Sequence, residues 1–168
     1  MLQEIVSWNN IHLLTIEDPI EYRIVPRRGN VTQKEVGVDV SSFEEGSKFM
    51  LRENPDIIMI GEIRDANTAK AILSATETGH MVFSTVHGGN FSLIIERLLG
   101  LIDGYNDTLQ AIRLSQALNT MISIKLVNSE RKVFIQKNEM NIKNLIKEHR
   151  LHELNTYLSK ENRTLGAE

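Results

Sequence analysis

The stretch that decides the fold is NPDIIMIGEIRD, residues 54–65. Its apolar part, residues 57–60, is bounded by Pro55 on one side and by Gly61 on the other. Because this run is too short for a helix and too apolar for a half-exposed strand, it predicts a buried inner strand of a parallel sheet. Ligands of open parallel sheets bind beyond the carboxyl ends of the strands, where Glu62 stands. Such a carboxylate either holds Mg²⁺ or a water in a nucleotide hydrolase, or simply begins the next helix.

The composition limits the class of protein. One domain is the usual expectation for 168 residues, and 41% hydrophobic with 24% charged residues is ordinary for a soluble globular chain. A net charge of −3 gives no electrostatic basis for binding nucleic acid or an anionic membrane. The absence of cysteine excludes disulfides and thiolate metal sites. Since neither a signal peptide nor a long apolar run is present, we expect a cytoplasmic protein.

A second strand is predicted at residues 11–16, and it ends in a cluster of three carboxylates that includes Glu17 and Glu21. Pro19 prevents the strand from continuing inside a sheet and fixes a turn. These carboxylates would then lie at the carboxyl end of their strand, as Glu62 does. The alternative is a solvated acidic turn.

Residues 22–40 alternate weakly and contain turn-forming glycine and proline, so we expect a hairpin of short strands. The positive charges on this segment are either solvated or lie near phosphate or a neighbouring subunit. They are Arg23, Arg27, Arg28 and Lys34.

A capping-box pattern at residues 41–45 predicts a helix that Pro55 ends. Lys48 and Arg52 lie on one face of this helix at helical spacing. They are either surface charges or, because the helix leads into the predicted inner strand, basic groups near the site.

Two histidines flank the next predicted strand, residues 81–86. A helix at residues 68–78, capped by Asp65 or Asn67, comes before it. His80 precedes the strand, whereas His87 follows it and would lie at the carboxyl end with the acidic groups. A lone histidine is more often structural, but the two glycines after His87 favour a functional position.

The rest of the chain continues with alternating elements. Amphipathic patterns predict helices, and two apolar stretches predict strands paired across a tight turn at residues 128–129. The predicted helices are residues 91–100, 108–120, 141–148 and 151–159, the strands are 121–127 and 132–136, and residues 160–168 are expected to fray.

Three blocks in this order resemble the secretion and type IV pilus ATPases, the motors of type II secretion, pilus assembly or retraction, and DNA uptake. TIEDPIE, residues 15–21, is similar to their acidic Asp box. Residues 54–65 are similar to their Walker B segment, and GHMVFSTVH, residues 79–87, is similar to their His box. The blocks cover most of residues 11–100.

The resemblance implies an α/β fold with a RecA-like P-loop NTPase core, a mostly parallel sheet flanked by helices, over residues 1–136. A C-terminal helical segment would occupy residues 137–168. It also implies a hexameric homo-oligomer that binds ATP and Mg²⁺ between subunits and acts on an inner-membrane platform protein. The location would then be cytoplasmic, peripheral to the inner membrane. Zinc is not expected without the four-cysteine module, and direct nucleic-acid binding, as in a RecA-like nucleic-acid motor, is disfavoured by the charge.

The same resemblance implies roles for the acidic residues. Glu17 would polarise the attacking water, with Glu21 in support. Glu62 would hold Mg²⁺ through its water shell.

The resemblance also implies roles for four other side chains. His87 and His80 would contact or sense the γ-phosphate or the subunit interface. Arg52 and Arg64 would supply positive charge at the site or across the ring. Lys48 stands where the family often has arginine, and it lacks the bidentate fork.

One required motif does not occur in these 168 residues: no glycine begins a phosphate-binding G-x-x-x-x-G-K-[ST] loop. In the family this Walker A loop lies upstream of the Asp box, so we expect the chain to begin inside the helix that follows it. Weak or absent ATP binding and negligible turnover are therefore expected of the chain alone. Two interpretations stay open: part of a motor ATPase subunit, or a non-hydrolysing structural or regulatory paralogue that binds the ring or the platform.

Overall fold

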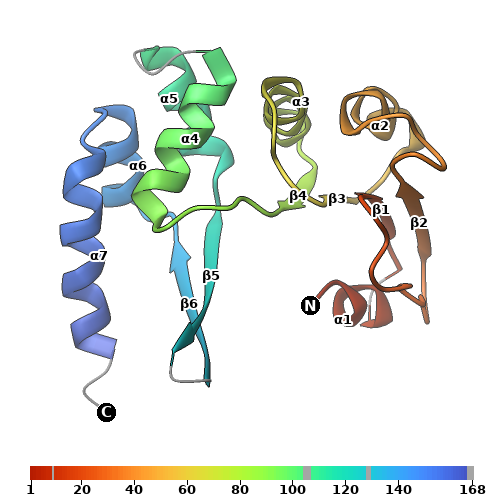
Figure 1. The fold of residues 1–168 in the computed structure, drawn as a ribbon, viewed down its shortest axis with the longest axis horizontal. Coiled ribbons are helices and arrows are strands. Elements are labelled where there is room, and N and C mark those ends of the chain that lie inside the picture. The colour runs from red at the N-terminus through yellow and green to blue at the C-terminus, as the bar shows by residue number, and fades with distance from the viewer. Residues whose placement is uncertain (9, 104–106, 128–129, 166–168) are drawn as a thin grey trace. The chain divides into compact units, whose positions relative to one another are not determined.

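The protein is described here by a computed structural model that covers residues 1–8, 10–103, 107–127 and 130–165 (Figure 1). The chain forms two compact units, the first from Met1 to Val86 and the second from His87 onward. The division expected from sequence, at residue 136, followed family motifs, whereas these units follow packing within the chain. Each unit is described by itself below.

The first unit is built on a four-stranded parallel sheet with the strand order β2-β1-β3-β4. The inner strand expected from the apolar run is confirmed, because β3 lies between β1 and β4. The strands are β1 (His12–Glu17), β2 (Asn30–Glu35), β3 (Ile57–Ile60) and β4 (Met81–Ser84).

Helices cover both faces of this sheet, with α2 and α3 on one face and α1 on the other (Figure 1). On the face of α2 and α3, alternate residues of β1 and β3 form the core. Close packing of α2 depends on Gly46, because a Cβ there would lie 2.8 Å from Ile16 Cδ1. The helical elements are α1 (Leu2–Trp8), α2 (Phe43–Met50), the short 3₁₀-helix η1 (Leu51–Glu53) and α3 (Ala66–Glu77), and the core residues are Leu14, Ile16, Met50, Ile58, Ile60 and Ala75.

The hairpin expected over residues 22–40 is wrong. This segment contributes one named strand, β2, which pairs in parallel with β1 from His12↔Asn30 to Glu17↔Glu35. Alternating side chains indicate a strand but do not identify its partner. Residues 18–29 instead cross over between the parallel strands, which need a connection of a dozen or more residues.

The capping predictions are confirmed, and the structure identifies which candidate residue caps each helix. Ser42 is the N-cap of α2: its hydroxyl accepts from Glu45 N at 3.0 Å, while the Glu45 carboxylate accepts from Ser41 N at 2.8 Å. Asp65, rather than Asn67, caps α3. Each cap satisfies a backbone N–H that the helix itself leaves unpaired.

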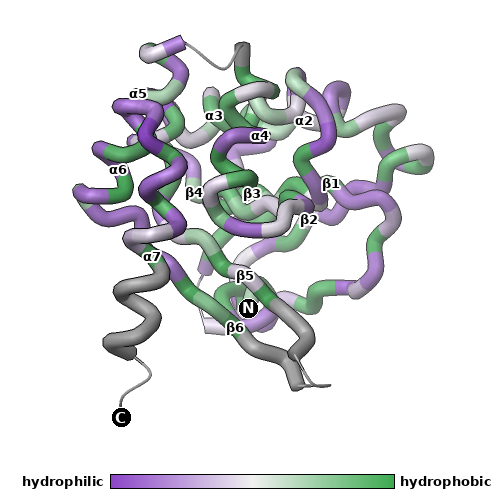
Figure 2. Tube along the Cα trace, turned by 60° about the vertical axis from the view of Figure 1, so that its left-hand side comes forward, coloured by the Kyte–Doolittle hydropathy of each residue, from purple (hydrophilic) through white to green (hydrophobic). Residues whose placement is uncertain are grey.

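The second unit combines helices with one antiparallel pair of strands, β5 and β6. The predicted pairing is confirmed, although its turn at residues 128–129 lies outside the described residues. Several described residues of the pair are hydrophobic (Figure 2), and Ile122 lies opposite Ile135. The elements are α4 (Phe91–Asp103), α5 (Thr108–Ala117), β5 (Thr120–Val127), β6 (Glu130–Lys137), α6 (Met140–Lys147) and α7 (Leu151–Leu165).

The end of the chain differs from its prediction. The predicted helix at residues 151–159 extends further, because α7 continues to Leu165, and residues 166–168 of the segment expected to fray lie outside the described residues. Its buried residues Leu151, Leu154 and Leu158 recur at helical spacing and anchor α7 within the second unit. Among the described residues, no helix is both long enough and apolar enough to cross a bilayer.

Candidate functional site at the carboxyl edge of the parallel sheet

The ends of β1 and β3 bring the two acidic segments of the first unit together. Ile16 pairs with Ile60, and Gly61 N donates to Ile16 O at 2.8 Å. A Cβ at Gly61 would lie 3.5 Å from Glu17 Cα, so the backbones run close together. Because the carboxyl ends of parallel strands share one edge, Glu17, the last residue of β1, and Glu62, which comes after β3, lie at the same edge.

Arg64 ties these two segments together through its guanidinium. Its Nε donates to Glu62 Oε2 at 2.6 Å, and its Nη1 lies 3.5 Å from Asp18 Oδ2. The hydrogen bond to Glu62, helped by the negative charge around it, raises the pKa of Arg64 above its ordinary value. The Glu62 side chain is only 14% exposed, so the arginine balances a carboxylate that is largely withdrawn from water.

Glu17 is held by neutral donors on the opposite side of β1 from the α2–α3 core. Its Oε1 accepts from Thr15 Oγ1 at 2.6 Å and from Gln33 Nε2 at 3.0 Å. Thr15 shares a face of β1 with Glu17, which the alternation of a strand could have indicated. Gln33 could not be found from sequence, because it reaches Glu17 only through the parallel pairing of β2 with β1.

The predicted supporting residue, Glu21, is exposed in the loop that follows β1. That loop is anchored close by, since Ile20 N donates to Glu35 Oε2 at 3.0 Å. The Asp18–Pro19 peptide within the loop is cis. Glu21 therefore lies exposed in the turn that follows β1, and its supporting role stays a prediction.

The end of β4 is also bound to the segment that carries Glu62. Thr85 Oγ1 donates to Gly61 O at 2.6 Å, and Ile63 N donates to Thr85 O at 3.0 Å. His87 begins the second unit two residues later, and its carbonyl accepts from Arg97 Nη1 at 3.0 Å. A meeting of His87 with the acidic residues stays a prediction.

The other two predicted side chains, His80 and Arg52, both precede a strand. His80 Nδ1 lies 3.1 Å from Thr78 Oγ1, at the end of α3 and before β4. Arg52 belongs to η1, before β3, with its guanidinium carbon 5.9 Å from the centre of the Phe49 ring. The fold thus places both at the amino ends of their strands, away from Glu17 and Glu62, and their roles at phosphate or a subunit interface stay predictions.

Lys48 belongs to α2, and its charged side chain is exposed. Its Nζ is 2.9 Å from Glu44 Oε1, at the i,i+4 spacing. This contact, followed by a hydrogen bond from Asn67, lowers the pKa of Glu44.

The donor set at the acidic edge suits magnesium better than a transition metal. Among the described residues, no group of three or more histidine or acidic side chains is arranged to hold a metal ion. Magnesium usually keeps several waters and takes only one or two carboxylates, with phosphates supplying further ligands. Glu62 and Glu17 provide carboxylates of this kind, so the residues present fit that ion.

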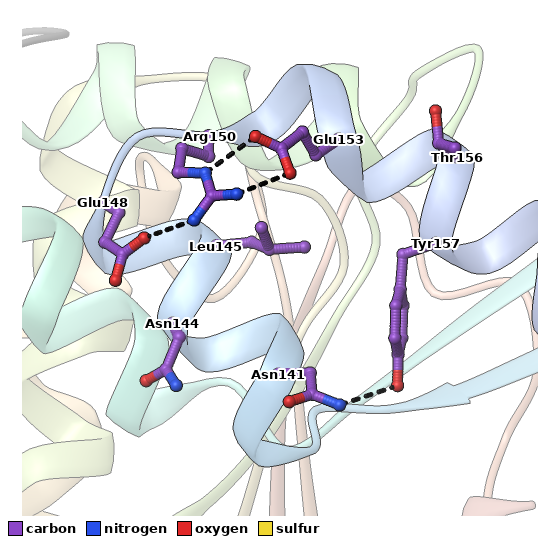
Figure 3. A pocket seen from close by; sticks show the side chains of 8 residues that line it. All are labelled: Asn141, Asn144, Leu145, Glu148, Arg150, Glu153, Thr156 and Tyr157. Atoms are coloured by element: carbon purple, nitrogen blue, oxygen red, sulfur yellow. Dashed lines mark hydrogen bonds and ion pairs between the residues drawn. The ribbon is translucent and has the colours of Figure 1, made fainter.

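A pocket of about 440 Å³ lies between α6 and α7 in the second unit (Figure 3). Arg150 donates to both carboxylate oxygens of Glu153 at 2.7 Å and to Glu148 at 2.9 Å. These groups neutralise one another, and Asn141 Nδ2 joins α6 to Tyr157 Oη of α7 at 3.3 Å. No predicted site residue lines the pocket, so we interpret it as part of the junction between the two helices.

Comparisons with known proteins agree with this geometry. A family model described as "Type II/IV secretion system protein" matches residues 1–162. The chain is 40% identical over 116 residues to the type IV pilus retractation ATPase PilT of Pseudomonas aeruginosa, across 69% of this chain and 34% of that protein. A crystal structure of the pilus retraction motor PilT with bound ADP has a TM-score of 0.85 at 35% identity, covering 95% of this chain and 48% of that one. The ATPase DotB of Legionella pneumophila has a TM-score of 0.80 at 27% identity, over 96% and 47% of the two chains.

The chain spans less than half the length of each of these proteins. Within that span, the structural matches confirm the α/β fold expected from the Asp box, the Walker B segment and the His box. The family model extends through both compact units. The chain therefore belongs to the type II/IV secretion system protein family.

Proposed function

We propose that this chain supplies the hydrolytic part of a motor ATPase that drives pilus assembly or retraction, protein secretion or DNA uptake. The observation that carries the proposal is the placement of Glu17 and Glu62 at neighbouring carboxyl ends of β1 and β3. The solved PilT structure with ADP, a nucleotide-binding relative with the same fold, supports it.

Within this proposal the acidic residues divide the chemistry between them. Glu17 orients the attacking water and accepts its proton, with Glu21 in support. Glu62 would hold Mg²⁺ through water, and the bound ion would supply neutralisation of charge on the transferring phosphoryl group. Because Arg64 is already paired with Glu62, it balances the negative charge of that carboxylate and holds it in place.

The remaining predicted residues belong to the assembled motor. His87 and His80 contact or sense the γ-phosphate or a neighbouring subunit, and Arg52 supplies charge across the interface. The assembly is a hexameric ring in the cytoplasm, bound to a platform protein of the inner membrane. Residues 1–136 form the ATPase part, and residues 137–168 form a helical extension.

Nucleotide binding in this proposal depends on residues other than these 168, because no phosphate-binding loop occurs among them. Equilibrium titration of the chain with Mg-ATP is expected to show no micromolar binding. A low-micromolar dissociation constant would overturn this part of the proposal.

The hydrolytic roles are tested by joining the chain to the loop-containing half of PilT from Pseudomonas aeruginosa. We expect this fusion to hydrolyse ATP, and Glu17→Gln or Glu62→Gln to lower kcat by roughly 10²–10⁴-fold. Glu139→Gln is the matched control, since Glu139 is exposed and makes no capping bond with its side chain. An active fusion that keeps its kcat in both site variants would refute the assignment.

The missing loop motif also supports a second candidate, a non-hydrolysing paralogue that binds the ring or the platform as a structural or regulatory module. Under this alternative the chain binds the assembled ring of a relative, or the platform protein of that ring, and does not itself hydrolyse nucleotide. Stable binding to such a ring, together with an inactive fusion, would favour it over the motor.

A further inference from the structure

The loop that follows Glu17 is held by side chains of β2. Ile24 N donates to Gln33 Oε1 at 2.8 Å, and Gln33 Nε2 donates to Tyr22 O at 3.0 Å. The same Nε2 donates to Glu17 Oε1 at 3.0 Å. One amide group thus contacts both the loop and the carboxylate to which the catalytic role is assigned.

The orientation of this amide is determined by its surroundings. Its nitrogen faces two acceptors, the Glu17 carboxylate and the Tyr22 carbonyl, and its oxygen faces the N–H of Ile24. A rotated amide would set its oxygen against two oxygens and its nitrogen against a donor. Gln33 therefore uses both of its N–H groups and its oxygen in this one arrangement.

Glu17 receives both of its hydrogen bonds on the same oxygen. Thr15 is fully buried, and its hydroxyl donates to Oε1, as does the side-chain amide of Gln33. No hydrogen bond to Glu17 Oε2 is found in the part of the chain that the structure describes. Because both donors are neutral, they orient the carboxylate without cancelling its charge, and they leave Oε2 available to a water.

We propose that Gln33 and Thr15 are positioning residues that aim Glu17 Oε2 at the attacking water, and that Gln33 does so through its direct contact with Glu17 and not through its contacts with the loop at residues 20–25. The inference rests on the proposed function of Glu17. Both residues donate to Glu17 Oε1, so each acts through Glu17.

The chain offers a matched control in Gln3. Its side-chain amide binds the same loop, with Nε2 donating to Val25 O at 2.7 Å and Oε1 accepting from Val25 N at 3.0 Å. Gln3 lies on α1 and makes no described contact with Glu17. A residue that only tethers the loop would therefore behave like Gln3, whereas a positioning residue would not.

The first test needs no nucleotide. In NMR spectra of the chain, Glu17→Gln is expected to shift the side-chain amide resonances of Gln33 and to leave those of Gln3 in place. Gln33→Met should remove hydrogen-exchange protection from the Ile24 amide, while Thr15→Val should leave that protection intact. Unshifted Gln33 resonances in Glu17→Gln would overturn the proposal.

The second test measures hydrolysis by the fusion described above. Gln33→Met and Thr15→Val are expected to lower kcat roughly 10- to 100-fold with KM little changed, because a small misplacement of a reacting group has about this effect. Thr15→Ser, which restores the hydroxyl, should recover activity, and Gln3→Met should keep the original kcat. Thr15→Val is nearly isosteric, so it tests the proposal even if Gln33→Met fails to fold.

The outcomes separate the two proposals. An inactive fusion with the natural residues counts against the proposed function. An active fusion that Glu17→Gln disables, but that Gln33→Met and Thr15→Val leave unchanged, overturns the positioning role alone. Equal losses in Gln3→Met and Gln33→Met would likewise reduce Gln33 to a tether of the loop.

Discussion

Arg64 shows how single residues determine the geometry of the acidic edge. It contacts the carboxylates of Glu62 and Asp18, which follow different strands. Only a planar guanidinium presents several donors in a fixed fork, so one arginine can contact two such groups at once. The arginine therefore restrains the two segments as well as balancing their charge.

Arg64→Lys is expected to keep the positive charge but to lose one of the two contacts, since an ammonium is a compact point charge. In the fusion this should lower kcat, and Arg64→Met should lower it further. Steady-state hydrolysis, with Arg150→Lys in the second unit as a control, provides the measurement. Full activity in Arg64→Met would contradict a restraining role.

Gly29 and Gly37 give a second comparison at this scale, because both have a positive φ, +70° and +85°. A Cβ on Gly29 would lie 2.1 Å from Ile11 O, whereas nothing lies within 4 Å of one on Gly37. Gly37→Ala should therefore cost about 1–2 kcal/mol through its backbone conformation alone. Gly29→Ala should cost clearly more, measured by urea denaturation, and equal losses would contradict the close approach of Gly29 to the backbone of Ile11.

At the scale of elements, N-caps fix where the two helices α2 and α3 of the first unit begin. The Ser42 cap fixes the start of α2, which packs on Ile16 of β1. The Asp65 cap starts α3 directly after the segment that carries Glu62 and Arg64. Both caps therefore help to place the acidic edge without taking part in its chemistry.

The two caps are expected to differ in strength. Asp65 accepts from Thr68 N and from Thr68 Oγ1, both at 2.8 Å, and Thr68 is fully buried. Ser42→Ala should cost about 1 kcal/mol. Asp65→Ala should cost about 1–3 kcal/mol more, because it leaves a buried hydroxyl without its acceptor.

Chemical denaturation of the single variants checks this difference. The double variant Asp65→Ala/Thr68→Val removes both partners, so it should recover part of the stability lost in Asp65→Ala. A double variant less stable than Asp65→Ala would show that the hydroxyl is not the cause.

At the scale of the whole molecule, acid stability depends on carboxylates in both compact units. Hydrogen bonds from Lys48, Ser41 and Arg150 lower the pKa of Glu44, Glu45 and Glu153, respectively, below the ordinary value of 4.5. A carboxylate with a lowered pKa stabilises the folded state above its unfolded pKa and loses that contribution as the pH falls through the folded value. These contributions are therefore present at neutral pH.

The contribution of these three carboxylates to the free energy of unfolding is expected to be constant above about pH 5. It should fall as the pH drops through and below 4.5. Arg150→Met removes the largest cause of the Glu153 shift, so it should reduce the acid loss of the second unit. Thermal unfolding across this pH range, followed by circular dichroism, provides the measurement. Identical acid profiles for the natural chain and Arg150→Met would contradict the assignment.

Local sequence determined the elements that depend on near neighbours. The apolar run at residues 57–60 predicted an inner strand, and Glu62 follows this strand at the carboxyl edge of the sheet. Ser42 and Asp65 could be identified as candidate caps because a cap acts on residues only three positions away. The family motifs were recognisable for the same reason, since each is a continuous segment.

Only the tertiary structure decided which distant residues meet. The parallel partner of β2, the contact of Arg64 with Asp18 and the contact of Gln33 with Glu17 all join segments far apart in the sequence. A side-chain pattern gives the face and the period of a strand, but the register between strands comes from packing of the whole sheet. For this reason the carboxylates could be predicted, whereas the contact of Gln33 with Glu17 could not.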